Sequence, residues 1–275
     1  MTTTPHDKAL RLQSLHQSSQ AFLIPNAWDP GSARLLVGMG FEALATSSGA
    51  AAMVLGRRDG QITREEAIDH ARAIAAAVDI PVSADLENGF GDAPQAAALT
   101  IRLAGEAGLV GGSIEDASGK AEQPIYDLAH AVERVAAAVE AVRALPFAFQ
   151  LTARAEGFLH GAPDLDALIT RLQAFEQTGA DVLFAPGLPN LAAVRAVCSA
   201  LRKPVNFMVA IPGKSFSVAD LQAAGVRRIS LATSLYRAAM TGLLDAAREV
   251  KEQGTFSYLD KATPTGVLVK LMAGN

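Results

Sequence analysis

The chain has 275 residues, of which 50% are hydrophobic and 19% charged, and its formal net charge at pH 7 is −4. That charge balance argues against nucleic-acid and anionic-membrane partners, which select basic surfaces, and the single cysteine excludes an internal disulfide framework and a cysteine-rich zinc site. The mean hydropathy is positive (+0.21), but no stretch approaches the ~18 apolar residues of a spanning helix and the N-terminus lacks a signal-peptide core, so we expect a cytoplasmic globular protein.

Eight short apolar runs with strand character recur along the chain, separated by segments with helical periodicity. The runs are residues 21–28, 42–48, 81–88, 109–116, 147–156, 181–187, 204–210 and 227–233. In the segment after Thr63, Ala67, Ile68, Ala71 and Ile74 share one helical face. The pattern therefore predicts strands alternating with amphipathic helices.

Helix boundaries carry their own signals. Thr63 with Glu66 fits the Ser/Thr-x-x-acid start of a helix, and Pro94 and Pro163 suit first helical positions. Four predicted helices end in a glycine just before the next strand, as expected where the backbone turns left-handed: Gly40, Gly108, Gly179 and Gly225.

Eight strand–helix units in about 250 residues match the size of a (β/α)8 TIM barrel. Strands that read as continuous apolar runs are typical of sheets covered on both faces. A doubly wound open sheet is the alternative, because a local pattern does not reveal closure. No linker divides the chain, so we expect one domain over residues 1–275, with an additional C-terminal helical tail at 255–275 that could pack on a neighbouring subunit.

Carboxylates follow two neighbouring strands at the point where each ends. Asp85 and Glu87 are two residues apart and so share one face of a strand, and Glu115 ends the next strand. In a TIM barrel these ends form the catalytic face, where three converging carboxylates would repel one another unless they shared a cation such as Mg²⁺. The alternative is that the acids cap helices or pair with Arg154. The matching strand ends favour a metal site.

Further polar residues end the other strands. Arg154 could clamp a substrate carboxylate bidentately, or it could pair with Glu115 or Glu156. Asn206 lies on the seventh strand, and Asp59 belongs to a charged loop that either reaches the barrel mouth or is solvated. The second strand ends in groups that could donate to an anion, or that simply form a small-residue turn into a helix: Ser47, Ser48 and Gly49.

These strand ends resemble the isocitrate lyase/phosphoenolpyruvate mutase superfamily over about residues 22–236, in the same chain order. The most specific segments are residues 84–91, with an acidic-Asn-Gly-aromatic-Gly pattern, and 113–116, with Ile-Glu-Asp. Supporting segments are residues 47–49, 55–59 and 152–156.

The resemblance implies Mg²⁺, with Mn²⁺ as a substitute, near Asp85, with Glu87 and Glu115 acting directly or through water. It implies that a 2-oxo acid or its enolate binds the metal while Arg154 and residues 47–49 hold the carboxylate. Asp59 and Lys120 join Arg154 as catalytic candidates. It further implies a homotetramer in which a C-terminal helix is exchanged between subunits.

One segment departs from the superfamily pattern. The lyases carry a cysteine and a histidine in the loop after the fourth strand, whereas residues 117–126 contain neither and retain only Lys120. We interpret the chain as a Mg²⁺-dependent carbon–carbon lyase or decarboxylase for a small 2-oxo or 2-hydroxy dicarboxylate, acting through a metal-stabilised enolate. The alternatives are phosphoenolpyruvate-mutase or phosphonopyruvate-hydrolase chemistry at a P–C bond, and a barrel that binds a 2-oxo acid without turnover.

Overall fold

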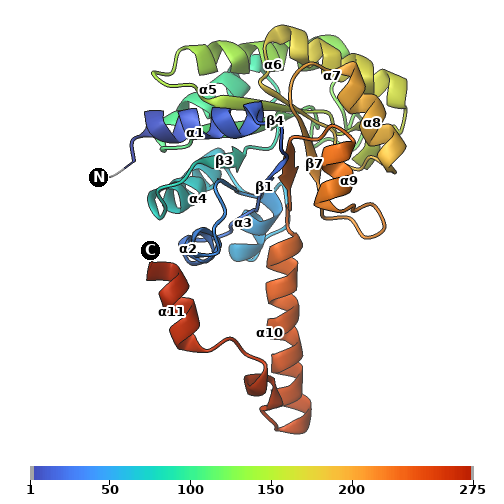
Figure 1. Ribbon diagram of the computed structural model, residues 1–275. Helices are drawn as coiled ribbons and strands as arrows, with labels where there is room; N and C mark the ends of the chain where they lie inside the picture. The colour runs from blue at the N-terminus through green and yellow to red at the C-terminus, as the bar shows by residue number, and fades with distance from the viewer. Residues whose placement is uncertain (1–2, 274–275) are drawn as a thin grey trace.

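The computed structural model describes residues 3–273 and contains eight parallel strands surrounded by helices (Figure 1). Each strand falls inside one of the eight predicted apolar runs. The strands are β1 (Phe22–Ile24), β2 (Leu44–Ala45), β3 (Val82–Asp85), β4 (Gly111–Glu115), β5 (Gln150–Arg154), β6 (Val182–Phe184), β7 (Val205–Met208) and β8 (Arg228–Ser230).

The sheet closes on itself. Its ladder runs β1-β8-β7-β6-β5-β4-β3-β2, and the first and last strands are joined by a parallel bridge between Asn26 and Ala45. The Ala45 amide donates to Pro25 O at 2.9 Å, and the Ala27 amide donates to Ala45 O at 2.8 Å. The fold is therefore a (β/α)8 barrel, and the open-sheet alternative is wrong.

Each strand is followed by a helix, β2 by two, and one further helix lies before β1 and one at the C-terminal end of the described residues. The helices are α1 (Pro5–Gln17), α2 (Pro30–Gly38), α3 (Ser48–Val54), α4 (Arg64–Ala76), α5 (Pro94–Glu106), α6 (Leu128–Arg143), α7 (Leu165–Thr178), α8 (Leu191–Ala200), α9 (Val218–Ala223), α10 (Ser234–Gln253) and α11 (Thr265–Ala273). Two short 3-10 turns are η1 (Gly157–Leu159) and η2 (Ser257–Asp260).

Most predicted helix boundaries are confirmed. Thr63 caps α4 in a reciprocal capping box with Glu66, and Pro94 is the first residue of α5. Pro163 does not start a helix: the Asp164 side chain accepts a hydrogen bond from the Ala167 amide as the N-cap of α7, and the proline immediately precedes this N-cap. The four helix-ending glycines adopt φ between +87° and +105°, the left-handed region that glycine tolerates best.

The N-terminal end of the barrel is covered by α1, which the sequence patterns did not reveal. Ala9 and Leu12 of this helix are fully buried against Ala43 and Val110, which precede β2 and β4. Because α1 covers the N-terminal end, the barrel is accessible from the C-terminal ends of the strands, where the predicted site residues lie.

A C-terminal arm, comprising α10, η2 and α11, extends from the barrel beyond β8 (Figure 1). No residue of α10 is buried, whereas α11 returns to lie against α2 of the same chain. Gly38 makes that crossing possible, because a Cβ there would lie 2.2 Å from Leu271 O. Within residues 3–273, every helix is too short or too polar to traverse a lipid bilayer.

Candidate active site

A cavity of about 1110 Å³ opens at the C-terminal ends of the strands. Most of the predicted site residues line it: Ser47, Ser48, Asp59, Asp85, Glu87, Glu115, Arg154 and Asn206. Gly49 lies directly behind this lining, and Lys120 lies at the rim. Residues from several strands and their following loops are thus brought to one place, as expected for a barrel of this kind.

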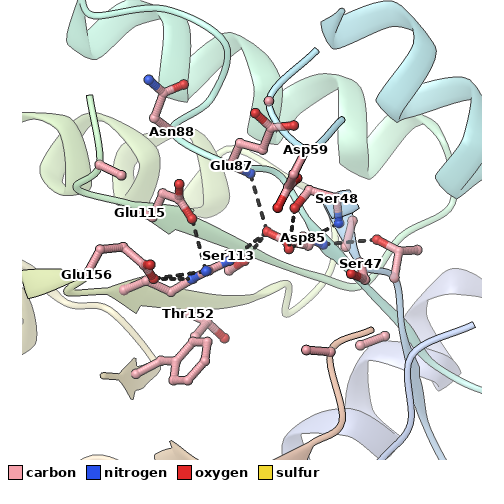
Figure 2. Close-up of a pocket in the computed structure, with 18 of the residues that line it drawn as sticks. Ser47, Ser48, Asp59, Asp85, Glu87, Asn88, Ser113, Glu115, Thr152 and Glu156 are labelled. Carbon is pink, nitrogen blue, oxygen red and sulfur yellow. Dashed lines mark hydrogen bonds and ion pairs between the residues drawn. The ribbon is translucent and has the colours of Figure 1, made fainter. Parts of the chain in front are cut away.

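Arg154 forms ion pairs with three of the carboxylates that Figure 2 labels: Asp85, Glu115 and Glu156. Its Nη1 is 2.7 Å from Asp85 Oδ1, and its Nη2 is 3.0 Å from Glu115 Oε2 and 2.9 Å from Glu156 Oε1. The register places these groups together, because Glu115 of β4 is the direct partner of Arg154 on β5. One guanidinium therefore neutralises part of the charge of three carboxylates.

The Asp85 carboxylate is held in place by further donors. The Ser48 amide and hydroxyl donate to its Oδ2 at 3.2 and 3.0 Å, and the Ser113 hydroxyl reaches its Oδ1 at 3.5 Å. Ser47 is the N-cap of α3, so the second-strand turn starts a helix and also supplies donors at the site. The two interpretations of residues 47–49, a turn into a helix and a group of donors, are therefore compatible.

Glu87 has an unusual backbone and an unpaired side chain. Its φ is +48°, and its buried Oε1 has no hydrogen-bond partner among the described residues. Burial raises the pKa of Glu87 to about 7, with further contributions from the charges of Asp85 and Asp59. Burial likewise raises the pKa of Glu115 well above its ordinary value. The carboxylates thus outnumber the cations that face them.

The loop that carries Glu87 is fixed from behind by a buried arginine. Arg134 of α6 is 1% exposed and donates to the backbone carbonyls of Asn88, Gly91 and Asp92. These bonds satisfy carbonyls of a loop that departs from regular structure. The left-handed backbone at Glu87 is therefore held by the surrounding structure, as strained residues at functional sites usually are.

The predicted metal ligands surround one cavity without forming a finished coordination shell. Among residues 3–273, no three His, Cys, Asp or Glu side chains converge as a metal-binding group. The donor chemistry nevertheless fits a hard divalent cation, since Glu87 Oε1 is an orphaned buried acceptor and the neighbouring carboxyl pKa values are raised by burial and by a shortage of positive charge. Mg²⁺ retains several waters and needs few direct protein ligands.

Asp59 lines the cavity from the loop after α3 and is also exposed to solvent, so both interpretations of this residue hold in part. Burial raises its pKa, and the charge of Asp85 raises it further. A Cβ at position 49 would lie 3.2 Å from both Asp59 Oδ2 and Thr233 Cγ2, so Gly49 provides the room that Asp59 occupies.

Asn206 and Lys120 take different positions. Asn206 is buried in the cavity wall, where its Nδ2 donates to Ser230 Oγ at 3.0 Å and its Oδ1 has no partner among the described residues. Lys120 is half exposed, and its Nζ lies 2.5 Å from Asp92 Oδ2 at the rim. Its predicted catalytic role would require the loop after β4 to move it away from Asp92.

Sequence reasoning missed two elements of the cavity. The guanidinium of Arg154 lies 5.1 Å from the centre of the Phe184 ring, which faces the cavity from β6. Deeper in the barrel, Arg228 of β8 lies beneath the carboxylates with Ser83 and Thr152. The available signal was the charged pair Arg227-Arg228 in an otherwise apolar strand, but alternation alone does not say which of the two points inward.

Comparison with known proteins agrees with this geometry. A solved structure from Burkholderia cenocepacia J2315, provisionally assigned as a lyase/mutase, is 49% identical with a TM-score of 0.95 and covers 98% of this chain and 97% of its own. Oxaloacetate decarboxylase from Pseudomonas aeruginosa strain UCBPP-PA14 is 29% identical over 251 residues, 89% of this chain and 85% of the relative. The 2-methylisocitrate lyase of Aeropyrum pernix is 29% identical over 258 residues, 90% and 80% respectively.

The family model described as phosphoenolpyruvate phosphomutase matches residues 12–251, which include all eight strands and every predicted site residue. This match and the relatives confirm the resemblance that the strand-end motifs carry. The chain belongs to the phosphoenolpyruvate phosphomutase family, within the isocitrate lyase/phosphoenolpyruvate mutase superfamily.

Proposed function

We propose that the protein is a Mg²⁺-dependent lyase of the decarboxylase type that acts on a small 2-oxo or 2-hydroxy dicarboxylate. The observation that carries this proposal is the position of Arg154, a buried guanidinium shared by Asp85, Glu115 and Glu156 at the wall of an open cavity. Such a group can bind an incoming carboxylate and also stabilise negative charge that develops on the substrate.

Asp85 would hold Mg²⁺, or Mn²⁺ in its place, with Glu87 and Glu115 contributing directly or through water. The ion supplies Lewis-acid polarisation of the substrate's C2 oxygen when it is bound. A cation beside Asp85 would also leave Arg154 free to turn part of its five-donor fork toward the substrate. Ser48, whose amide and hydroxyl already donate at this point, lies within the same group of donors.

For a 2-oxo dicarboxylate, the bond cleavage that we propose leaves its electron pair on the substrate as an enolate, with the C2 carbonyl as the acceptor. In a decarboxylation, the C3–C4 bond breaks, CO₂ departs, and C3 later accepts one proton. No acid is needed at the leaving group, which suits a chain whose loop 117–126 has neither cysteine nor histidine. Asp59, with its raised pKa, is the candidate to hold that proton, and Lys120 is a second candidate if it leaves Asp92.

A second candidate function is P–C bond chemistry on a phosphonate, favoured by the description of the family whose model the chain matches. It would use the same stabilised enolate and the same Arg154. A third is binding of a 2-oxo acid without turnover, motivated by the missing loop cysteine.

The C-terminal arm supports a proposal about assembly. Leu243 and Leu244 of α10 are 59% and 53% exposed, and Phe256 and Leu259 beyond them are 56% and 59% exposed. An apolar surface of this kind on a projecting helix is expected to pack against other protein. We propose that the arms of two copies pair or exchange, as in a homotetramer.

The experiment is a panel of oxaloacetate, 2-methylisocitrate and phosphonopyruvate, assayed with Mg²⁺ and with the metal chelated. Mg²⁺-dependent loss of CO₂ from oxaloacetate, or cleavage of 2-methylisocitrate, supports the lyase. Turnover of phosphonopyruvate alone would establish the second function instead. Mg²⁺-dependent binding of oxalate or pyruvate by calorimetry, with no turnover of any compound, would establish the third.

A further inference from the structure

The barrel interior holds a second arginine that has no carboxylate partner among the described residues. Arg228 is 5% exposed and lines the same cavity as Arg154. Its Nη1 donates to Thr152 Oγ1 at 3.0 Å and its Nη2 donates to Ser83 Oγ at 3.3 Å, whereas its buried Nε has no hydrogen-bond acceptor within residues 3–273. This isolation contrasts with the three carboxylates around Arg154.

A buried charge that lacks an opposite charge is costly, so its presence calls for a physical reason. Burial lowers the pKa of Arg228 to about 10, with a further lowering by the charge of Arg154 and a smaller opposing contribution from the charge of Asp85, so Arg228 remains a cation at neutral pH. Two neutral hydroxyl groups do not neutralise it. The side chain is therefore a fixed positive charge that faces an open cavity with part of its donor set unused.

The groups around Arg228 can also serve a ligand. Because the Thr152 and Ser83 hydroxyls accept from the guanidinium, their own hydrogens are available to donate to a third group. Asn206 is the strand partner of Arg228, and its unpaired Oδ1 can accept from a hydroxyl of the ligand or from a water. We call Arg228, Thr152 and Ser83 the barrel floor.

The barrel floor lies deeper in the barrel than Asp85 and Arg154, which we call the upper site. Ser83 precedes Asp85 by two residues on β3, and Thr152 precedes Arg154 by two residues on β5, on the same inward face in both cases. Two residues of strand correspond to about 6.6 Å. A four-carbon dicarboxylate can span such a step, since three C–C bonds of about 1.5 Å each separate its carboxyl carbons and the oxygens add further reach.

We propose that the barrel floor is an anion subsite that takes the second carboxylate of a four-carbon 2-oxo or 2-hydroxy dicarboxylate. It selects dicarboxylates over monocarboxylates of the same length. The inference rests on the proposed function, which places the first carboxylate at Arg154 and the residues around Asp85.

The test compares two ligands that differ only at the group meant for the floor. Malate and 2-hydroxybutyrate share a four-carbon 2-hydroxy acid chain, and malate ends in a carboxylate where 2-hydroxybutyrate ends in a methyl group. Their dissociation constants are measured by calorimetry with Mg²⁺ for the wild type, Arg228→Met and Arg228→Lys. Arg237→Met, which removes an exposed cation from the mouth of the same cavity, is the control.

We expect the wild type to bind malate more tightly than 2-hydroxybutyrate, on the order of 10-fold or more, as a charge-assisted contact provides. Arg228→Met should remove that preference by weakening malate binding alone, Arg228→Lys should keep part of it, and Arg237→Met should leave it intact. Melting temperatures report whether each variant is folded. If Arg228→Met does not fold, Arg228→Lys and Thr152→Val, which removes one floor hydroxyl, decide the question by the same ratio.

Two results would overturn the subsite, and they are distinguishable. One result is that the wild type binds both acids equally, or that the folded Arg228 variants bind both acids more weakly in equal proportion. In that case the floor does not bind the second carboxylate, and the proposed function is unaffected. If the wild type binds neither acid with Mg²⁺, the proposed function itself is wrong and the subsite falls with it.

Discussion

The barrel buries its large apolar side chains, whereas the C-terminal arm leaves many of its own exposed. Barrel side chains such as Leu86 and Ile114 are at most 1% exposed, whereas α10 has no buried residue and leaves Leu243 and Leu244 more than half exposed. The barrel therefore buries its own apolar side chains and carries the polar cavity, while the arm leaves apolar side chains exposed. Substitutions in the cavity should change the chemistry, and substitutions on the arm should change the assembly.

The largest effect is expected from Asp85→Ala. Asp85 accepts from Arg154, Ser48 and Ser113 and is the central candidate for holding Mg²⁺, so its loss removes one partner of Arg154 and the main proposed ligand of the metal. Mg²⁺-dependent turnover should fall on the order of 100-fold or more, and Mg²⁺ affinity by calorimetry should fall with it.

Asp245→Ala on the arm is the matched control, because Asp245 is an exposed carboxylate that pairs only with Arg248 among the described residues. Its turnover and metal affinity should equal those of the wild type. Unchanged Mg²⁺ affinity in Asp85→Ala would remove the metal assignment.

Arg154→Lys should give the next largest effect. Lysine retains the charge but replaces the planar five-donor fork with a single ammonium, which cannot contact Asp85, Glu115 and Glu156 and still hold a substrate carboxylate bidentately. We expect kcat/KM to fall about 10-fold to 100-fold. Arg248→Lys on the arm, also an arginine paired with an aspartate, should have no effect. A catalytic efficiency equal to the wild type in Arg154→Lys would show that the fork is not used.

The strands and the upper site were predictable because their signals are local. Each strand is an apolar run, and Asp85, Glu115 and Arg154 stand out as charges at the ends of three of them. The floor was not predictable, because the partners of Arg228 come from β3 and β5, far away in the chain. The contact of Lys120 with Asp92 and the direction of α10 likewise depend on tertiary placement, which no local pattern encodes.

The pKa shifts of a barrel carboxylate and an arm carboxylate have opposite signs: the pKa of Glu87 is raised and that of Glu249 is lowered. The pKa of Glu87 is raised from 4.5 to about 7, so the folded protein keeps a proton that the unfolded chain releases near pH 4.5. Glu87 therefore makes the metal-free protein less stable as pH rises from about 4.5 to 7. Glu87→Gln should remove this loss and raise the melting temperature at pH 8 on the order of 2 °C, after allowance for its partial exposure.

Thermal melts at pH 5 and pH 8 with a chelator present test this expectation. Glu249 on the arm is the control: hydrogen bonds, first from the Thr255 hydroxyl and then from Ser257 and Tyr258, lower its pKa, so Glu249→Gln should give no rise at pH 8. A lower melting temperature for Glu87→Gln than for the wild type at pH 8 would mean that the ionised Glu87 carboxylate does not destabilise the folded protein.

The smallest effect on chemistry is expected from Leu243→Glu combined with Leu244→Glu. Both side chains are exposed on α10, so the substitutions should change the free energy of unfolding of one chain by no more than about 0.5 kcal/mol. Burying a leucine in an interface contributes about 1.5–3 kcal/mol, and in a symmetric pair each substitution acts twice, so assembly should weaken strongly. Light scattering across a range of protein concentrations should show a lower mass than the wild type, with turnover per chain retained. Turnover that falls with the mass would mean that a second copy completes the cavity, and the separation of chemistry in the barrel from assembly on the arm would then be wrong.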